Sequence, residues 1–256
     1  MKSDPVVTID QLSYDYPDGT PALREITMEV FRGESVALLG PNGAGKSTLL
    51  HHLNGTLIGK GKVTILGLPL TKENLKQIRR RVGLVFQNPD DQLFCPTVYD
   101  DVAFGPLNMG LDPATVRSHV ARALDLVGLH GFEQRSAHHL SEGEKKRVAL
   151  ATVLSMDSEI LALDEPTDNL DPAGGQVLME RIRLLPQTKI IVTHHLALAM
   201  DLCDRAIFLQ AGRKIEDLPM EALLGSRDTL EQFGFDADLA QWLCERRKKG
   251  KGLRAK

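Results

Sequence analysis

The most constraining feature of the sequence is a glycine-rich turn between a short apolar run and a helical pattern. Residues 35–39 (SVALL) are predicted to form a buried strand, residues 40–47 are GPNGAGKS, and residues 46–53 have helical spacing. The turn fits GxxxxGK[ST] in the strand-to-helix context that this motif requires. Its glycines allow successive N–H groups to converge on phosphate oxygens at the positive end of the helix. The segment therefore predicts a nucleotide phosphate site.

Two side chains at the end of this turn have the chemistry that a bound nucleotide requires. Lys46 would reach the β and γ phosphates as a catalytic cation, and Ser47 would ligate Mg²⁺. The predicted nucleotide-binding residues of the segment are Gly40, Pro41, Asn42, Gly43, Ala44, Gly45, Lys46, Ser47 and Thr48.

A second apolar run ends in two carboxylates. Residues 160–166 are ILALDEP, which predicts a buried strand followed directly by Asp164 and Glu165. Alone, this pattern would indicate only a strand and an acidic turn. In an open parallel sheet, however, ligands bind at the carboxyl ends of the strands, where the phosphate loop also lies. We therefore expect Asp164 to hold Mg²⁺ and Glu165 to position or deprotonate the attacking water as a catalytic residue.

Short apolar runs alternate with helical patterns over much of the chain. Further strands are predicted at residues 82–86, 190–193 and 206–209, and helices at residues 172–184 and 196–202. Such alternation is typical of a parallel sheet covered by helices on both faces. The predicted fold class is therefore α/β with a mostly parallel sheet.

Two segments depart from this alternation. Residues 5–34 combine strand-forming runs with turn residues, and they predict an N-terminal antiparallel β-subdomain. Residues 98–154 have helical spacing, and they predict an inserted α-helical subdomain at about residues 88–155. We expect a main domain at residues 1–225 and a C-terminal helical extension at residues 226–256.

Composition and charge exclude several classes of protein. The chain has 256 residues, of which 42% are hydrophobic and 25% charged, as is ordinary for a globular protein. Its formal net charge of −3 is too balanced for a protein whose whole surface binds nucleic acid. Seven of the 31 Lys and Arg lie in residues 246–256, which leaves 24 basic and 34 acidic residues, a formal charge of −10, elsewhere. Cys95, Cys203 and Cys244 lack the spacing of a disulfide framework or a zinc site.

The sequence also indicates where the protein resides. No run of about 18 apolar residues is free of charge, Gly or Pro, so we expect no membrane span. Residues 1–10 lack the apolar core of a secretory signal, so we expect an intracellular, soluble protein. The basic tail at residues 246–256 is expected to be solvated or to lie against anionic lipid beside a membrane partner. Trp242 is expected to pack on a preceding helix.

A third motif makes the set specific. Residues 140–147 are LSEGEKKR, and Ser141 and Glu144 have the spacing of a capping box, which alone would indicate only a capped helix. With the other motifs in order, namely the phosphate loop, Gln87, ILALDEP, Asn169-Leu170-Asp171 and His194, the chain resembles the ATP-binding cassette (ABC) ATPases. The resemblance covers about residues 5–220 and implies a P-loop NTPase core of the ABC type.

The resemblance implies roles for residues outside the phosphate loop. Tyr16 resembles the aromatic residue that stacks on adenine, with Tyr14 as the alternative. Gln87 is similar to the glutamine that contacts Mg²⁺ or water and links the core to the helical subdomain. His194 resembles the switch histidine that reaches the γ-phosphate and organises the catalytic carboxylate, whereas His195 is expected at the surface or behind it.

The family resemblance also implies that the site is shared between two subunits. Ser141 and Gly143 would bind the nucleotide held by a second subunit, and Asp171 would help to cross that interface. Two departures from the family pattern are present. Glu142 stands where glycine is common and would place a carboxylate near the partner's γ-phosphate, and Asp168 stands where a small polar residue is frequent and receives no role.

Residues 83–107 resemble a subgroup, the ATPase subunits of energy-coupling-factor importers of the cobalt and nickel group. This resemblance implies two ATPase subunits, identical or paralogous, under a membrane scaffold protein and a substrate-capturing membrane subunit. It implies a peripheral place on the cytoplasmic face of the cell membrane and no nucleic acid partner. The alternatives are a vitamin importer of the same type and a soluble, non-transport ABC ATPase; a small-molecule kinase would lack the motif at residues 140–147 and the switch histidine.

Three pairs of adjacent histidines occur, at residues 51–52, 138–139 and 194–195. Adjacent side chains point to opposite faces of a strand and lie about 100° apart on a helix. Each pair by itself is therefore a poor chelate, and we do not assign metal-ion binding to the pairs.

Overall fold

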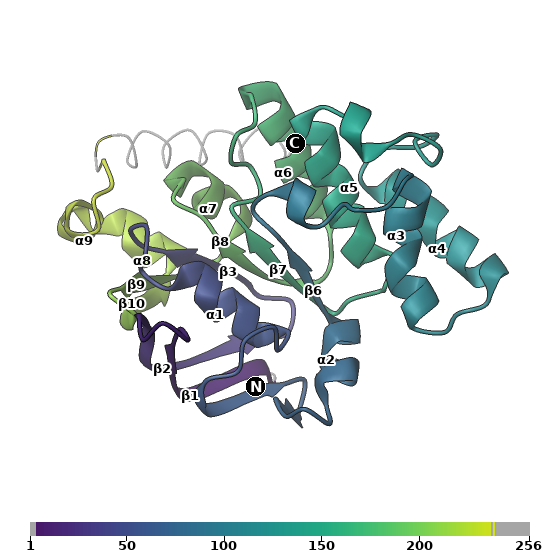
Figure 1. The fold of residues 1–256 in the computed structure, drawn as a ribbon. Helices are drawn as coiled ribbons and strands as arrows, with labels where there is room; N and C mark the ends of the chain where they lie inside the picture. Colours follow the sequence, from purple (N-terminus) through teal and green to yellow (C-terminus); the bar gives the residue numbers. More distant parts are fainter. Residues whose placement is uncertain (1–3, 237, 239–256) are drawn as a thin grey trace.

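The structure, a computed structural model, describes residues 4–236 and residue 238 (Figure 1). Its central six-stranded sheet has the strand order β10-β9-β3-β8-β7-β6. The strands are β3 (Ser35–Leu39), β6 (Val82–Val85), β7 (Ile160–Asp164), β8 (Thr188–Val192), β9 (Arg205–Gln210) and β10 (Arg213–Pro219). Neighbouring strands are parallel except that β10 runs antiparallel to β9. The mostly parallel sheet is therefore confirmed.

Burial explains why the inner strands are continuous apolar runs. Every residue of β3, β7 and β8 is buried, as expected when helices or a second sheet cover both faces. Successive residues of β3 enter different cores: Val36 and Leu38 pack with one hydrophobic cluster, Ala37 and Leu39 with the other.

Helices cover the two faces of this sheet. The helix α1 (Lys46–Leu53) belongs to the first cluster through Leu49, Leu50 and Leu53, together with residues of the second sheet. The helices α6 (Pro172–Leu184) and α7 (Leu196–Leu202) belong to the other cluster. All three helices have the predicted bounds.

The second sheet is antiparallel and has the order β2-β1-β4-β5. Its strands are β1 (Pro5–Asp15), β2 (Pro21–Phe31), β4 (Lys60–Ile65) and β5 (Leu68–Pro69). The N-terminal antiparallel sheet is thus confirmed, and β4 and β5, which were not expected in it, extend it.

A group of helices follows β6. The helices α3 (Val98–Asn108), α4 (Pro113–Leu126) and α5 (Glu142–Leu154) lie together at one side of the molecule in Figure 1, with short 3₁₀ turns η1 (Pro89–Asp91) and η2 (Ala137–His139) beside them. The helical character of residues 98–154 is therefore confirmed, although the limits of a subdomain stay a prediction. The remaining helices are α2 (Leu75–Arg81), α8 (Met220–Gly225) and α9 (Arg227–Gln232).

Two predicted strands, at residues 82–86 and 190–193, were one residue too long at their carboxyl ends, since β6 ends at Val85 and β8 at Val192. The strand β6 ends at Val85, because the N–H of Phe86 donates to Oε1 of Gln92 at 3.0 Å instead of continuing the ladder. Trp242 and the basic tail lie outside the described residues. In the described part of the chain, the helices are too short or too polar to cross a bilayer.

Candidate active site

The phosphate loop depends on glycine at two points of close approach. Gly40 has φ +139°, and a Cβ there would lie 2.0 Å from the backbone oxygen of Leu209. Gly45 has φ +98°, and a Cβ there would lie 2.6 Å from the oxygen of Ala22. Larger residues would therefore force the loop away from β9 and β2. These contacts fix the turn that connects β3 to α1.

Lys46 lies at the mouth of the loop and closes it. Its Nζ donates to the backbone oxygens of Gly40 at 2.8 Å and Pro41 at 2.9 Å. Burial lowers the pKa of the Lys46 ammonium, and the charges of Glu165 and Asp164 oppose that effect. The ammonium therefore lies between the carbonyl oxygens of the loop and the carboxylates of Asp164 and Glu165.

Asp164, the last residue of β7, and Glu165, which follows it, are both buried at the carboxyl end of the sheet. Burial raises the pKa of Asp164, the hydrogen bond with Ser47 lowers it, and the charge of Glu165 raises it further. Oδ1 of Asp164 is buried and has no hydrogen-bond partner in the described part of the chain. An unsatisfied buried oxygen beside a serine hydroxyl suits an octahedral, oxygen-preferring cation such as Mg²⁺.

Glu165 and His194 form a pair. The Nδ1 of His194 lies 3.0 Å from Oε1 of Glu165, and the backbone N–H of His194 donates to Oε2 at 3.3 Å. Because a carboxylate only accepts hydrogen bonds, Nδ1 is the donor in this contact, and Nε2 is the ring nitrogen left for a ligand. The predicted base and the predicted switch histidine are therefore in direct contact.

The backbone of Glu165 is held in an unusual conformation. Its φ is +42°, in the left-handed region that side chains other than glycine rarely adopt. Its N–H donates to Val192 at 3.0 Å, and its carbonyl accepts from Nζ of Lys146 at 3.0 Å. Lys146, which belongs to α5 and is only 4% exposed, was not expected at the site from its place in the sequence.

The predicted residues from separate elements line one cavity of about 610 Å³. Tyr16 lines it, is 39% exposed, and shares a 2.7 Å hydrogen bond with Thr48. Tyr14 instead packs edge-on against Tyr16 and His52 and is not among the lining residues, so the geometry favours Tyr16 of the two candidates. The other predicted residues that line the cavity are Asn42, Gly43, Ala44, Gly45, Lys46, Ser47, Thr48, Gln87, Glu165 and His194.

Gln87 and Asp168 both line this cavity and contact each other directly. Nε2 of Gln87 donates to Oδ2 of Asp168 at 2.9 Å, and this bond is the main reason that the pKa of Asp168 is lowered. Gln92 links the segment after β6 to α5, because its Nε2 donates to the carbonyl of Ala149 at 2.9 Å and to the hydroxyl of Thr152 at 2.8 Å. Asp168 and Gln92 are the neighbours that the sequence did not reveal.

The residues expected to act on a second subunit lie apart from this cavity. Ser141 caps α5 in the predicted capping box: its hydroxyl and its N–H both donate to Oε2 of Glu144 at 2.8 Å. Gly143 follows in the first turn of α5. The Glu142 carboxylate is exposed, 4.0 Å from Nζ of Lys145. Asp171 caps α6 by accepting from Gly174 at 3.2 Å.

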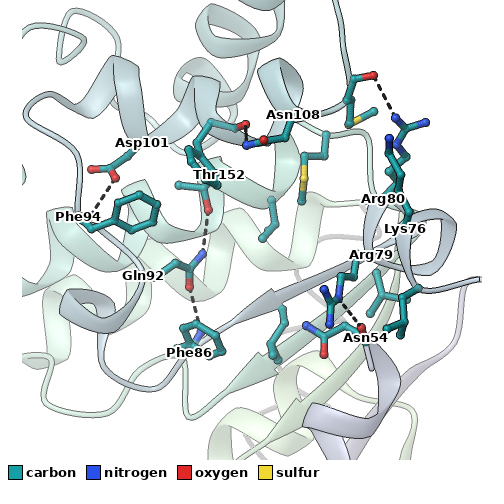
Figure 2. A pocket seen from close by; sticks show the side chains of 18 of the residues that line it. Asn54, Lys76, Arg79, Arg80, Phe86, Gln92, Phe94, Asp101, Asn108 and Thr152 are labelled. Carbon is teal, nitrogen blue, oxygen red and sulfur yellow. Dashed lines mark hydrogen bonds between the residues drawn. The ribbon is translucent and has the colours of Figure 1, made fainter. Parts of the chain in front are cut away.

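A separate groove of about 880 Å³ lies between α2 and α3, with β6 and α5 behind it (Figure 2). Exposed Lys72 and Lys76 line one side. On the other side lie Phe94, which is 67% exposed, and Phe104, which is 49% exposed, and their rings meet edge to face at 5.1 Å. The groove thus presents apolar surface beside positive charge.

Comparisons with known proteins agree with this geometry. The ABC transporter family model matches residues 23–168. A putative ABC transporter ATP-binding protein of Streptomyces coelicolor is 52% identical over 89% of this chain and 90% of its own length. The energy-coupling factor transporter ATP-binding protein EcfA of Methanothermobacter thermautotrophicus is 50% identical over 84% of this chain and 72% of its own length.

Solved structures give the same result. The structure of cbiO1 from Clostridium perfringens, described as part of the ABC transporter complex cbiONQ, has a TM-score of 0.79 at 37% identity and covers 90% of this chain and 94% of its own. The dimeric ATP-binding cassette MJ0796 bound to ADP and Pi has a TM-score of 0.75 at 26% identity, covering 84% and 98%. The chain belongs to the ABC transporter family and is an ATP-hydrolysing subunit that resembles the energy-coupling-factor type.

Proposed function

We propose that this chain powers an energy-coupling-factor importer for transition-metal ions of the cobalt and nickel class. ATP would close two ATPase subunits, and hydrolysis would open them. The observation that carries the enzymatic part is the contact between Glu165 and His194 in the cavity that the phosphate loop lines. The importer type is supported by the relatives named EcfA and by the likeness to cbiO1. The metal class rests on the resemblance of residues 83–107.

The residues of the cavity divide the chemistry among them. Lys46 would exchange the carbonyls of Gly40 and Pro41 for phosphate oxygens, and the loop N–H groups would add further donors. Tyr16 would stack on adenine. Glu165, oriented by His194, would hold the attacking water in line with the γ-phosphate and accept its proton.

The acidic strand end fits Mg²⁺. Asp164, whose buried Oδ1 has no hydrogen-bond partner among the described residues, and Ser47 beside it would hold the ion, and Gln87 would reach it or its water after leaving Asp168. When bound, Mg²⁺ neutralises the charge that develops on the phosphate oxygens.

A dimer is the form that we propose for the working site. The cavity lacks any contribution from Ser141 or Gly143 of the same chain, which supports a role for these residues on a second copy's nucleotide. The dimeric MJ0796 structure with ADP and Pi supports the same arrangement by similarity. Whether the second subunit is identical or a paralogue does not change the roles of these residues.

We assign the groove of Figure 2 to a cytoplasmic segment of a membrane partner. A segment with an apolar face would cover Phe94 and Phe104, and acidic side chains on it would face Lys72 and Lys76. A partner that supplies the membrane spans would place this chain peripherally on the cytoplasmic face.

The first experiment measures inorganic phosphate release from Mg²⁺-ATP by wild type and Glu165→Gln. Wild type should release phosphate without any phosphorylated acceptor, and Glu165→Gln should bind ATP yet lose hydrolysis by about a hundredfold or more. Hydrolysis retained in Glu165→Gln would contradict the assigned base.

A second experiment separates the importer from its alternatives. The tagged chain should co-purify with membrane proteins, and Phe94→Glu should abolish that association without reducing phosphate release. Uptake of labelled cobalt or nickel by vesicles that contain the complex supports the metal class, whereas uptake of a vitamin alone would replace it. Recovery without any membrane partner would favour the soluble, non-transport ATPase.

A further inference from the structure

Three metal-ligating side chains from two loops converge beside Glu165. Asp168 lies in the loop after β7, and His194 and His195 follow β8. One ligand atom from each of the three lies within 4.8 Å of the others. Both histidines are exposed and Asp168 is half-buried, so ions in solution reach the cluster.

The backbone explains why these residues meet. Glu165 has φ +42° and Asn169 has φ +60°, and the N–H of Asp168 donates back to the oxygen of Glu165 at 3.1 Å. This tight turn returns Asp168 to the mouth of the cavity. The two imidazole rings lie with centroids 3.9 Å apart and planes tilted by 41°, so they face the same region and not opposite sides. Asp168 supplies the third ligand that a histidine pair alone lacks.

Two imidazoles and one carboxylate suit Zn²⁺, Co²⁺ or Ni²⁺, whereas Mg²⁺ and Ca²⁺ prefer oxygen ligands. Ligand atoms around a tetrahedral zinc ion lie roughly 3.3 Å apart, which the exposed rings reach by side-chain rotation. Nε2 of Gln87 donates to Oδ2 of Asp168 at 2.9 Å, and Nδ1 of His194 contacts Oε1 of Glu165 at 3.0 Å. Such outer contacts orient metal ligands and favour the lone pair on the other ring nitrogen.

We propose that Asp168, His194 and His195 form a site for a divalent transition-metal ion, and that an ion bound there inhibits ATP hydrolysis. The inhibitory part rests on the proposed role of His194. An ion on Nε2 occupies the nitrogen that would otherwise approach the γ-phosphate, so the two uses exclude each other. In an importer of such ions, occupation of this site would slow ATP hydrolysis, and with it uptake, as the ion accumulates on the cytoplasmic side.

Zinc binding to the nucleotide-free full chain tests the site independently of hydrolysis. Isothermal titration with Zn²⁺ compares wild type, His195→Gln, Asp168→Asn and the matched control His139→Gln, which changes an exposed histidine of another pair. We expect His195→Gln and Asp168→Asn to weaken binding by at least about tenfold and His139→Gln to leave it unchanged. Equal binding by all four proteins, or an equal loss in His139→Gln, would overturn the site.

Phosphate release at saturating Mg²⁺-ATP, with free Zn²⁺ fixed by a chelator buffer, tests the consequence. Without Zn²⁺, His195→Gln should match wild type within about twofold; with Zn²⁺, wild type and His139→Gln should be inhibited and His195→Gln should resist. Zinc binding at the site without inhibition would overturn the regulatory part. A chain that binds Zn²⁺ as expected but hydrolyses no ATP with Mg²⁺ alone would count against the proposed function and would still support the site.

Discussion

Lys146→Met tests how α5 controls the catalytic carboxylate. Nζ of Lys146 donates to the carbonyl of Glu165 at 3.0 Å, and burial lowers the pKa of this ammonium while the charges of Asp168 and Glu142 oppose that effect. Methionine keeps the length of the side chain and removes the donor. Glu165 sits at φ +42°, and its carbonyl also accepts from the N–H of Asp168 at 3.1 Å, so the variant removes one of two hydrogen bonds that hold this conformation.

The size of the effect on Glu165 follows from two opposing free energies, the hydrogen bond from Lys146 and the strain of the left-handed backbone. A hydrogen bond from a charged donor contributes about 1.5–3 kcal/mol, and a strained left-handed residue costs on the order of 1–3 kcal/mol. Losing the bond shifts the balance between the present Glu165 conformation and relaxed ones by about tenfold to 150-fold. We therefore expect kcat to fall by about tenfold or more, while KM for ATP changes by less than about twofold because Lys146 lies outside the phosphate loop.

Stability should not follow activity in this variant. Removing a buried ammonium relieves its desolvation and offsets the lost hydrogen bond, so the free energy of unfolding should change by less than about 1 kcal/mol. The matched control is Lys145→Met, whose Nζ makes a surface contact with Asp90 at 2.8 Å. That contact contributes about 0–1 kcal/mol, and kcat should be unaffected. Equal kcat values for Lys146→Met and Lys145→Met would show that the Lys146 contact does not position Glu165.

Three further predictions concern stability and closure. Gly40→Ala should lower the free energy of unfolding by more than about 3 kcal/mol, because its Cβ would lie 2.0 Å from a backbone oxygen. The control Gly43→Ala, at φ +77° with open space around the Cβ, should lower it by about 1 kcal/mol. Urea unfolding that finds Gly43→Ala as destabilising as Gly40→Ala, or more so, would contradict the loop geometry. Glu142→Gly should strengthen ATP-driven dimerisation about threefold to tenfold, roughly 1 kcal/mol, because it removes a carboxylate near the partner's γ-phosphate; unchanged or weaker association in sedimentation would sink this idea. Burial raises the pKa of Asp217, but hydrogen bonds from Arg205 hold the pKa below the ordinary value of 3.8. The ionised pair therefore stabilises the fold fully above pH 3.8, the unfolded-state value. This stabilisation is lost as the pH falls through the lower pKa of the folded state. Asp217→Asn should therefore cost about 1–3 kcal/mol at pH 7 and progressively less in acid, and a deficit that does not change with pH would contradict this.

Features with local causes were predictable from the sequence. The helix α1 begins at Lys46 and ends at Leu53 as expected, because the glycine turn and the following apolar spacing are both continuous in the chain. The acidic end of β7 was predictable because a fully buried strand must be apolar until it reaches the sheet edge.

Features that depend on distant contacts were not predictable. The strand β4 pairs with β1 across more than forty residues, and its first half is exposed, so it carries little apolar pattern. Lys146 looks like a solvated lysine of a polar helix start, and only the packing of α5 against the end of β7 buries it. The meeting of Asp168 with His194 likewise needs two loops to fold toward each other.

In the proposed cycle, ATP closes two copies of this chain, and hydrolysis assisted by Glu165 opens them again. Sedimentation velocity of wild type and Glu165→Gln, each with Mg²⁺-ATP, with Mg²⁺-ADP and without nucleotide, tests it most directly. We expect a stable dimer of Glu165→Gln with ATP alone, and monomers of both proteins with ADP. A Glu165→Gln protein that binds ATP and remains monomeric would contradict the closure of two identical subunits.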